Sequence, residues 1–217
     1  MKPDYTLYAI TERSLVGRQS LYEQVEAALR GGAGIIQLRE KNISEQEFID
    51  EAVKLKEICH SCNVPLIIND NLDVALKSGA DGVHVGAEDM PVSEIRRIAG
   101  DNFIIGATAK TVEQAVKAEK DGADYLGSGA VFPSPTKKNA LRITPELLKK
   151  ICTAVKIPVV AIGGITLENM DEVKDCNISG IAVVSAVFGA DDIEKATKQL
   201  KQKADCIVNA ASCRLRF

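Results

Sequence analysis

Short apolar runs and amphipathic runs alternate along the whole chain. Eight of the apolar runs are rich in Val, Ile and Tyr and are too short for a helix, so each predicts a β-strand. They occupy residues 5–10, 35–39, 66–69, 82–85, 103–107, 125–127, 159–162 and 181–184.

The segments between these runs carry apolar residues three and four positions apart, which is the spacing of one helix face. Strands that alternate with such helices predict a parallel sheet with crossover helices. The clearest stripes are Leu21, Val25, Ala28 and Leu29; Phe48, Ala52, Leu55, Cys59 and Cys62; and Ile193, Ala196, Leu200, Ala204 and Ile207.

A short repeat precedes every second strand, at residues 32–35, 79–82, 122–125 and 177–180. The first three copies begin with glycine, which suits a left-handed helix C-cap that leads directly into a strand. Eight strand–helix units in 217 residues leave about 27 residues for each unit. We therefore expect an α/β protein with a single (β/α)8 TIM barrel domain over residues 1–217. The competing fold, an open doubly wound sheet, would carry a glycine-rich fingerprint that residues 10–13 lack.

Composition narrows the function classes. With 27 basic and 30 acidic residues the net charge is −3, and aromatic residues make up 4% of the chain, so neither a basic field nor stacking platforms for nucleic acid are expected. No stretch approaches the length of a membrane span, and no signal-like apolar block follows the N-terminus. Six cysteines in a chain of this length then indicate reduced thiols and a cytoplasmic protein. The sequence is compatible with a homo-oligomer but does not define one.

The chemistry of a TIM barrel lies at the C-terminal ends of its strands. After the second strand, the period of two places Gln37, Arg39 and Lys41 on one side of the chain and Leu38 and Glu40 on the other. Two cations and an amide at a barrel mouth suit a polyphosphate, which needs charge-assisted donors. The alternative is a solvated strand end, which the apolar start of this strand disfavours.

Carboxylates follow the third and fourth strands. Asn69 and Asp70 end the third strand, and Asp89 lies just after the fourth. Beside a cationic phosphate site, Asp70 and Asp89 suggest a shared Mg²⁺ that phosphate oxygens also coordinate. The alternative is that Asn69 and Asp70 form an ordinary helix N-cap, and spacing alone leaves this open.

Later strand ends offer main-chain groups instead of charge. Gly163 and Gly164 end the seventh strand, and Val184 and Ser185 end the eighth, where such barrels often bind phosphate through backbone N–H groups. For the glycine pair the alternative is an ordinary turn. Residues 129–142 have no periodicity and carry hydroxyls, lysines and prolines, which suit either a clamp over an anionic substrate or a long surface loop. A cationic and a neutral anion site together predict two phosphorylated substrates, or one with phosphates at both ends.

Two further features predict no chemistry. Cys59, His60 and Cys62 look like half of a zinc site, but both cysteines fall on a helix stripe and no second pair has the right spacing, so buried thiols are expected. His84 lies on a strand between two valines and is interpreted as an interior histidine with hydrogen-bond partners, rather than a general base.

Taken together, these motifs resemble the thiamine phosphate synthase family. The matching segments are residues 37–41, 68–71, 78–86, 88–90, 132–137, 161–165 and 184–185, and the resemblance spans about residues 5 to 200. The resemblance implies an enzyme that joins hydroxymethylpyrimidine diphosphate to hydroxyethylthiazole phosphate and releases pyrophosphate by a dissociative substitution. It implies no nucleic-acid or membrane partner.

The same resemblance assigns roles to individual residues. Arg39, Lys41 and Lys137 would be the catalytic cations. The implied contacts to the pyrimidine and its pyrophosphate are Gln37, Arg39, Lys41, Asn69, Thr108 and Lys137; the implied Mg²⁺ ligands are Asp70 and Asp89; the implied contacts to the thiazole phosphate are Ser134, Thr136, Gly164, Val184 and Ser185.

The chain departs from the family pattern at three positions. Thr108 stands where the family has serine, Lys110 where it has a nearby histidine, and Ser134 where it has threonine. The alternatives are a thiazole tautomerase relative, a non-catalytic phosphate-binding barrel, and a phosphate-handling isomerase or epimerase. The tautomerase would need the histidine that Lys110 replaces, and the isomerase would need a proton-transfer pair at the mouth.

Overall fold

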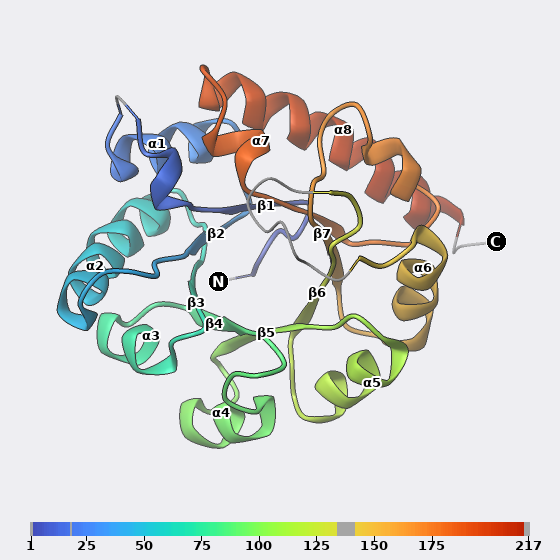
Figure 1. Cartoon of the computed structure of the whole chain (residues 1–217), viewed down its shortest axis with the longest axis horizontal. Coiled ribbons are helices and arrows are strands. Elements are labelled where there is room, and N and C mark those ends of the chain that lie inside the picture. Colours follow the sequence, from blue (N-terminus) through green and yellow to red (C-terminus); the bar gives the residue numbers. More distant parts are fainter. Residues whose placement is uncertain (1, 18, 134–141, 215–217) are drawn as a thin grey trace.

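The computed structural model describes residues 2–17, 19–133 and 142–214, and within them eight parallel strands close into a barrel in chain order, β1 next to β2 through to β8 next to β1 (Figure 1). This confirms the predicted TIM barrel, and each observed strand starts and ends within two residues of its prediction. The strands are β1 Leu7–Ile10, β2 Ile35–Leu38, β3 Leu66–Asn69, β4 Gly82–Val85, β5 Ile104–Thr108, β6 Tyr125–Gly129, β7 Val159–Ile162 and β8 Gly180–Val183.

Helices form a ring around the barrel, as the amphipathic stripes predict (Figure 1). The exception is the crossover from β7 to β8, where the short 3-10 helix η2 (Met170–Val173) stands in place of an α-helix. The remaining helical elements are η1 Arg13–Leu15, α1 Leu21–Arg30, α2 Glu45–Ser61, α3 Leu72–Ser78, α4 Val92–Ala99, α5 Val112–Lys120, α6 Pro145–Ala154, α7 Ser185–Phe188 and α8 Ile193–Arg214.

The period of two along each strand separates the core into two layers. Outward side chains such as Leu38 and Ile68 pack against the helices in one large cluster. Inward side chains fill the barrel in a second, smaller cluster, which consists of Tyr8, Ile10, Ile35, Ile67, Tyr125, Val160 and Ala182. The inner layer contains two tyrosines, so the barrel interior is not wholly apolar.

The sequence repeat before the even-numbered strands has a clear structural cause. In two copies its third residue is an aspartate whose side chain accepts from the first residues of the preceding strand: Asp81 from the Leu66 N–H at 2.8 Å and Asp124 from the Ile105 N–H at 2.7 Å. The leading Gly79 has a φ of 67° and caps α3 in the left-handed conformation, as predicted. The repeat thus sets the register between neighbouring strands at the N-terminal end of the barrel.

The cysteine prediction is right for some residues and wrong for others. Cys59 and Cys176 are buried, and burial raises the pKa of Cys59 to about 12. Cys62, however, is the C-cap of α2 and is exposed, because the helix ends before the stripe reaches it, and Cys206 is also exposed. His60 bonds to Asp81 at 2.9 Å, and the described residues contain no group of three or more His, Cys, Asp or Glu side chains arranged for a metal.

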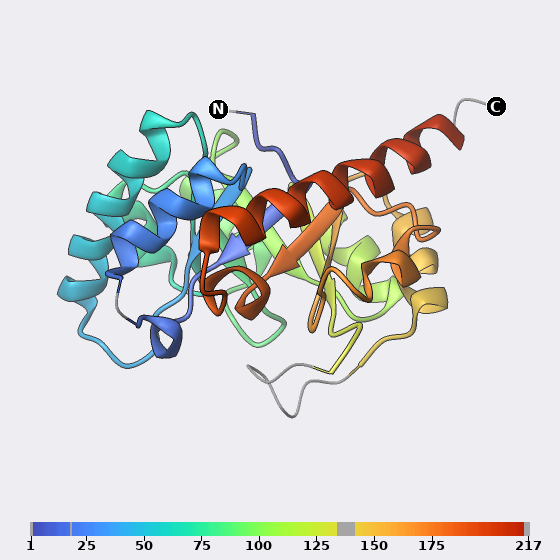
Figure 2. The ribbon, with the colours of Figure 1, turned by 90° about the horizontal axis from the view of Figure 1, so that it is seen from above.

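The mouth of the barrel lies on the side opposite the chain start and the C-terminal end of α8. Figure 2 shows η1 and α7 together on that side, where the strands end. In the part of the chain that the structure describes, no helix is long and apolar enough to cross a membrane.

Arg96 fastens the opposite, N-terminal end of the barrel. Its guanidinium donates to the carbonyls of Gly100, Phe103 and Gly122 and to the carboxylate of Asp124, all at 2.7 Å. The planar fork of arginine can serve these acceptors together, whereas a lysine ammonium cannot.

We therefore expect Arg96→Lys to lower the free energy of unfolding by about 1.5–3 kcal/mol, because it leaves acceptors without a donor. Urea titration at neutral pH measures this. The matched control is Arg97→Lys on the exposed face of α4, which should change stability by no more than about 0.5 kcal/mol. Equal effects of the two variants would contradict the assigned role of Arg96.

Candidate active site

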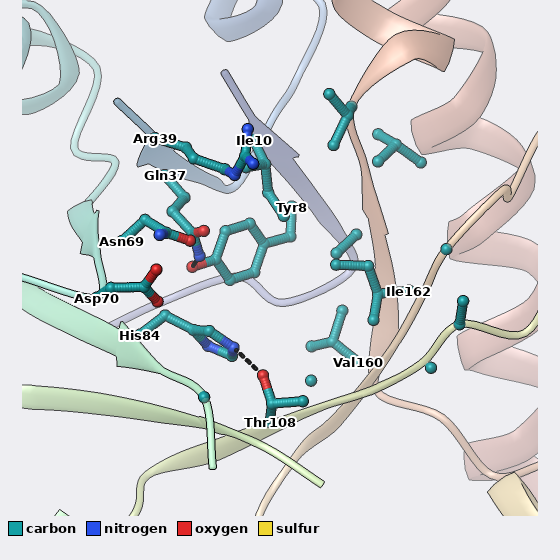
Figure 3. Close-up of a pocket in the computed structure, with 18 of the residues that line it drawn as sticks. Tyr8, Ile10, Gln37, Arg39, Asn69, Asp70, His84, Thr108, Val160 and Ile162 are labelled. Atoms are coloured by element: carbon teal, nitrogen blue, oxygen red, sulfur yellow. Dashed lines mark hydrogen bonds between the residues drawn. The ribbon is translucent and has the colours of Figure 1, made fainter. Parts of the chain in front are cut away.

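The C-terminal ends of the strands surround a cavity of about 590 Å³. All the predicted site residues that fall within the described residues line it; Ser134, Thr136 and Lys137 lie outside the described residues. The lining residues among the predicted set are Gln37, Arg39, Lys41, Asn69, Asp70, Asp89, Thr108, Gly164, Val184 and Ser185. Figure 3 looks into this cavity, with Gln37, Arg39, Asn69 and Asp70 extending from neighbouring strand ends.

The end of β2 follows the predicted alternation. Gln37 and Arg39 face the cavity, whereas Leu38 packs in the outer core and Glu40 pairs with Arg13 at 2.6 Å behind the strand. Burial raises the pKa of the Glu40 carboxyl, and the hydrogen bond from Arg13 opposes this rise. The alternative of a solvated strand end does not hold, because Gln37 is only 3% exposed.

Arg39 has a partner that the sequence did not indicate. Its guanidinium forms an ion pair with Glu12, which follows β1, and its backbone N–H donates to the Thr11 hydroxyl at 3.0 Å. The signal was available, since Glu12 lies at a strand end like the other site residues. An anionic ligand bound by Arg39 either shares the guanidinium with Glu12 or displaces it.

Asp70 and Asp89 meet at the mouth, after β3 and β4. Burial and the nearby Asp89 carboxylate raise the pKa of Asp70, while the positive charge of Lys41 opposes this rise. Asp89 also accepts from the Gly86 N–H at 2.7 Å, which fixes its direction. Asn71, not Asn69 or Asp70, caps α3 by accepting from the Val74 N–H at 2.9 Å. The alternative that Asn69 and Asp70 form the N-cap is therefore wrong, because Asn71 takes that role. The Asp70 carboxylate faces the cavity instead.

This donor set fits a hard divalent cation. The Asp89 carboxylate opposes ionisation of Asp70, a cost that a positive ion between the two would relieve, and oxygen ligands are those that Mg²⁺ prefers. Among the described residues no third acidic, His or Cys side chain joins them. The other ligands would have to be water and substrate oxygens.

Thr108 and Lys110 complete the rim after β5. The Thr108 hydroxyl lies 3.1 Å from His84 Nε2 (Figure 3), and the other ring nitrogen of His84 lies 3.1 Å from the Tyr125 hydroxyl. His84 is thus hydrogen-bonded through both nitrogens, as predicted, but it is half-buried and lines the cavity rather than lying wholly in the interior. Lys110 lines the cavity, and its backbone N–H donates to the Gln114 side chain at 2.7 Å.

The glycine pair after β7 is required by packing, whatever ligand it also binds. Gly163 and Gly164 have φ values of 100° and 63°, and a Cβ on Gly164 would lie 2.2 Å from the Pro133 carbonyl oxygen. Phe132 N–H also donates to the Gly163 carbonyl at 2.9 Å. The pair therefore lets the backbone that follows β6 pack directly on the end of β7.

Comparison with known proteins gives one consistent family. A family model described as thiamine monophosphate synthase matches residues 7–187. The chain is 49% identical over 198 residues to the thiamine-phosphate synthase of Caldanaerobacter subterraneus subsp. tengcongensis, covering 91% of this chain and 92% of that protein. It is 47% identical over 197 residues to the thiamine-phosphate synthase of Clostridium tetani, covering 91% of this chain and 94% of that protein.

Solved structures agree. A thiamine phosphate pyrophosphorylase from Pyrococcus furiosus superimposes with a TM-score of 0.87 and 44% identity, covering 95% of this chain and 98% of that chain. The N-acetylmannosamine-6-phosphate 2-epimerase from Clostridium perfringens superimposes with a TM-score of 0.63 at 19% identity, covering 96% and 93%. The second likeness shows the barrel fold alone.

Proposed function

The chain belongs to the thiamine monophosphate synthase family, and from this premise we propose how its residues make thiamine phosphate. The protein is a transferase that joins hydroxymethylpyrimidine diphosphate to hydroxyethylthiazole phosphate and releases pyrophosphate. The observation that carries the proposal is that one cavity is lined by both kinds of anion-binding group. Arg39 and Lys41 follow β2, and Gly164 and Ser185 follow β7 and β8.

The cationic side would hold the diphosphate. Arg39 and Lys41 follow β2 and project into the cavity beside Asp70, and Lys137 is expected to join them. As the bond from the ring methylene to oxygen breaks, negative charge grows on the departing pyrophosphate. Fixed cations stabilise that charge without reorganising, which lowers the barrier to ionisation.

Mg²⁺ would be held by Asp70 and Asp89. Bound there, it would act as a Lewis acid that neutralises the diphosphate oxygens. The Asp89 carboxylate is held in place by the Gly86 N–H, and the backbone N–H of Asp70 donates to the His84 carbonyl at 2.8 Å. Main-chain hydrogen bonds therefore fix the Asp89 carboxylate and the backbone of Asp70, and the Asp70 carboxylate also interacts with the Asn69 and Asp89 side chains.

One wall of the cavity is apolar. Ile10, Val160, Ile162 and Ala182 line it, and Figure 3 shows Ile10, Val160 and Ile162 facing the polar strand ends. Such a wall would exclude water from the carbocation that ionisation leaves on the pyrimidine methylene. The thiazole nitrogen would then be the nucleophile that captures it.

The neutral side would hold the thiazole phosphate. Gly164, Val184 and Ser185 lie around the ends of β7 and β8, and Ser134 and Thr136 are expected to add hydroxyls. No protein base is needed, because the attacking lone pair sits on a neutral ring nitrogen. This agrees with His84, whose ring nitrogens both face hydroxyl groups.

We also propose a cytoplasmic location. The described cysteines are all unpaired, at positions 59, 62, 152, 176 and 206, which suits a reducing compartment.

We expect purified protein to form thiamine phosphate from the two substrates when Mg²⁺ is present. Chromatographic detection of the product, with pyrophosphate release as a second readout, measures this. Removing Mg²⁺ with a chelator should stop the reaction, and adding it back should restore the rate. If the folded protein forms no product in the presence of Mg²⁺, the proposed function is wrong. If it keeps full activity in the chelator, the proposed role of Mg²⁺ is wrong.

A further inference from the structure

A continuous line of polar side chains crosses the barrel, and each of its members lines the cavity. Gln37 Nε2 donates to the Tyr8 hydroxyl at 2.7 Å, and that hydroxyl lies 2.7 Å from the Tyr125 hydroxyl. The Tyr125 hydroxyl lies 3.1 Å from His84 Nδ1, and His84 Nε2 lies 3.1 Å from the Thr108 hydroxyl. The reaction as proposed above uses Gln37 and Thr108, at the two ends of this line, and gives Tyr8, Tyr125 and His84 no part.

The line of hydrogen bonds from Gln37 to Thr108 has a direction. Gln37 donates its N–H to Tyr8, and each buried hydroxyl has one proton that needs an acceptor. The arrangement that satisfies both hydroxyls sends the Tyr8 proton to Tyr125 and the Tyr125 proton to His84 Nδ1. A neutral imidazole that accepts at one nitrogen donates from the other, so Nε2 donates to the Thr108 oxygen. A single donor at one end therefore decides the orientation of every group along the line.

The fold makes room for this chain at the expense of ordinary packing. Gly106 on β5 takes an inward position, and a Cβ there would lie 2.3 Å from the Tyr125 hydroxyl and 2.5 Å from His84 Nδ1. A Cβ on Gly127 of β6 would lie 3.0 Å from the His84 ring. Two strands of the barrel thus lack side chains where the tyrosine and the histidine meet.

Both tyrosine hydroxyls stay protonated. Burial raises the pKa of Tyr8 and of Tyr125 well above the usual value, and the two rings are 2% and 0% exposed. A buried hydroxyl without a partner is costly, so each is held to its neighbour. The line therefore acts as one unit rather than as separate hydrogen bonds.

We propose that Tyr8, Tyr125 and His84 are positioning residues that fix which way the Gln37 amide and the Thr108 hydroxyl present their hydrogen-bonding groups to the substrate ring. With one N–H given to Tyr8, Gln37 offers its oxygen and its second N–H to the cavity. Such a pair complements an aminopyrimidine edge, where an amino group lies beside a ring-nitrogen acceptor. If the hydrogen bonds ran in the opposite direction, the Gln37 amide would be flipped, with its oxygen toward Tyr8. It would then favour the opposite pattern on the substrate, an oxo group beside a ring N–H. This inference rests on the proposed function.

The test is Tyr125→Phe, which removes the central hydroxyl and keeps the ring. We expect kcat/KM for the aminopyrimidine diphosphate to fall about 5- to 10-fold, the loss of one hydrogen bond. The preference for this substrate over its oxo analogue should fall about as much, because the amide can turn over, while KM for the thiazole phosphate stays unchanged. Equal losses for both pyrimidines would overturn the proposal.

The matched control is Tyr5→Phe. The Tyr5 ring lies 5.1 Å from the Tyr125 ring, but the hydroxyl of Tyr5 is not in the chain. This variant should keep the preference between the two pyrimidines. A loss of preference equal to that of Tyr125→Phe would mean that ring packing, not the hydrogen-bond chain, is responsible, and would overturn the proposal.

A measurement without substrate separates this proposal from the function. Nitrogen-15 NMR of the two histidine rings in the resting protein reports the tautomer of each, and His60 serves as the internal reference. We expect His84 to carry its proton on Nε2 and to change its signal in Tyr125→Phe. A proton on His84 Nδ1 would overturn the proposed direction of the hydrogen bonds even if the protein has synthase activity. If His84 has the predicted tautomer but the protein is inactive, the proposed function is wrong and the hydrogen-bond proposal is not.

Discussion

Replacing Arg39 with alanine is expected to lower kcat for thiamine phosphate formation by about 10²–10³-fold, the usual cost of removing one preorganised donor from a developing anion. The reason is local: Arg39 is one of the two cations that follow β2 and line the cavity, and Glu12 forms an ion pair with it there. Steady-state kinetics at saturating concentrations of both substrates measures the loss.

Two variants make the Arg39 experiment specific. Arg30→Ala removes an arginine that pairs with Glu194 at the surface and should leave kcat unchanged. Arg39→Lys keeps the charge without the planar fork and should recover part of the rate. If Arg39→Ala retained more than about a third of the wild-type kcat, a catalytic role for this cation would be untenable.

Asp70→Asn is expected to reduce Mg²⁺-dependent activity by about 100-fold or more, since it removes one of two proposed ligands. The same change should leave Tm unchanged or raise it. Burial and Asp89 raise the pKa of Asp70 in the folded state, so its ionised form destabilises the fold at any pH above the unfolded value, and the neutral amide removes that cost. Asparagine also tolerates the φ of 62° at this position.

The control for Asp70 is Asp73→Asn, in the exposed first turn of α3. It should keep full activity at every Mg²⁺ concentration. A rate–Mg²⁺ curve for each variant, with a thermal melt of the same samples, gives both readouts. Normal turnover by Asp70→Asn would show that the metal assignment is wrong, and a large drop in Tm would show that the carboxylate is structural.

Much of the architecture could be read from local patterns. Alternating apolar runs, stripes three and four residues apart and the repeat at residues 79–82 and 122–125 depend on neighbours in the chain, so they predict strands, helices and caps before any tertiary contact is known. Once the barrel is inferred, strand ends must share one mouth. For that reason residues as far apart as Gln37 and Ser185 could be assigned to one cavity.

Local patterns do not show which of several neighbouring residues caps a helix, or which side chain forms an ion pair with which. Asn71 rather than Asp70 caps α3, and Cys62 lies just past the end of α2. Hydrogen bonds decide where a helix begins and ends, and the spacing of apolar residues carries no information about them. The pairing of Arg39 with Glu12 was likewise missed, since it joins the ends of two strands whose loops differ in length.

The sequence by itself therefore determined the barrel, the strand boundaries and the set of polar strand ends, because these follow from short-range periodicity and chain order. Only the tertiary structure decided which of the polar groups form hydrogen bonds with one another. Tyr8 and Tyr125 meet across 117 residues of sequence, and they do so because the register that sets Gly106 opposite Tyr125 leaves space at the centre of the barrel. Closure of the sheet fixes that register, and no local pattern encodes which inward side chains then come within hydrogen-bond distance.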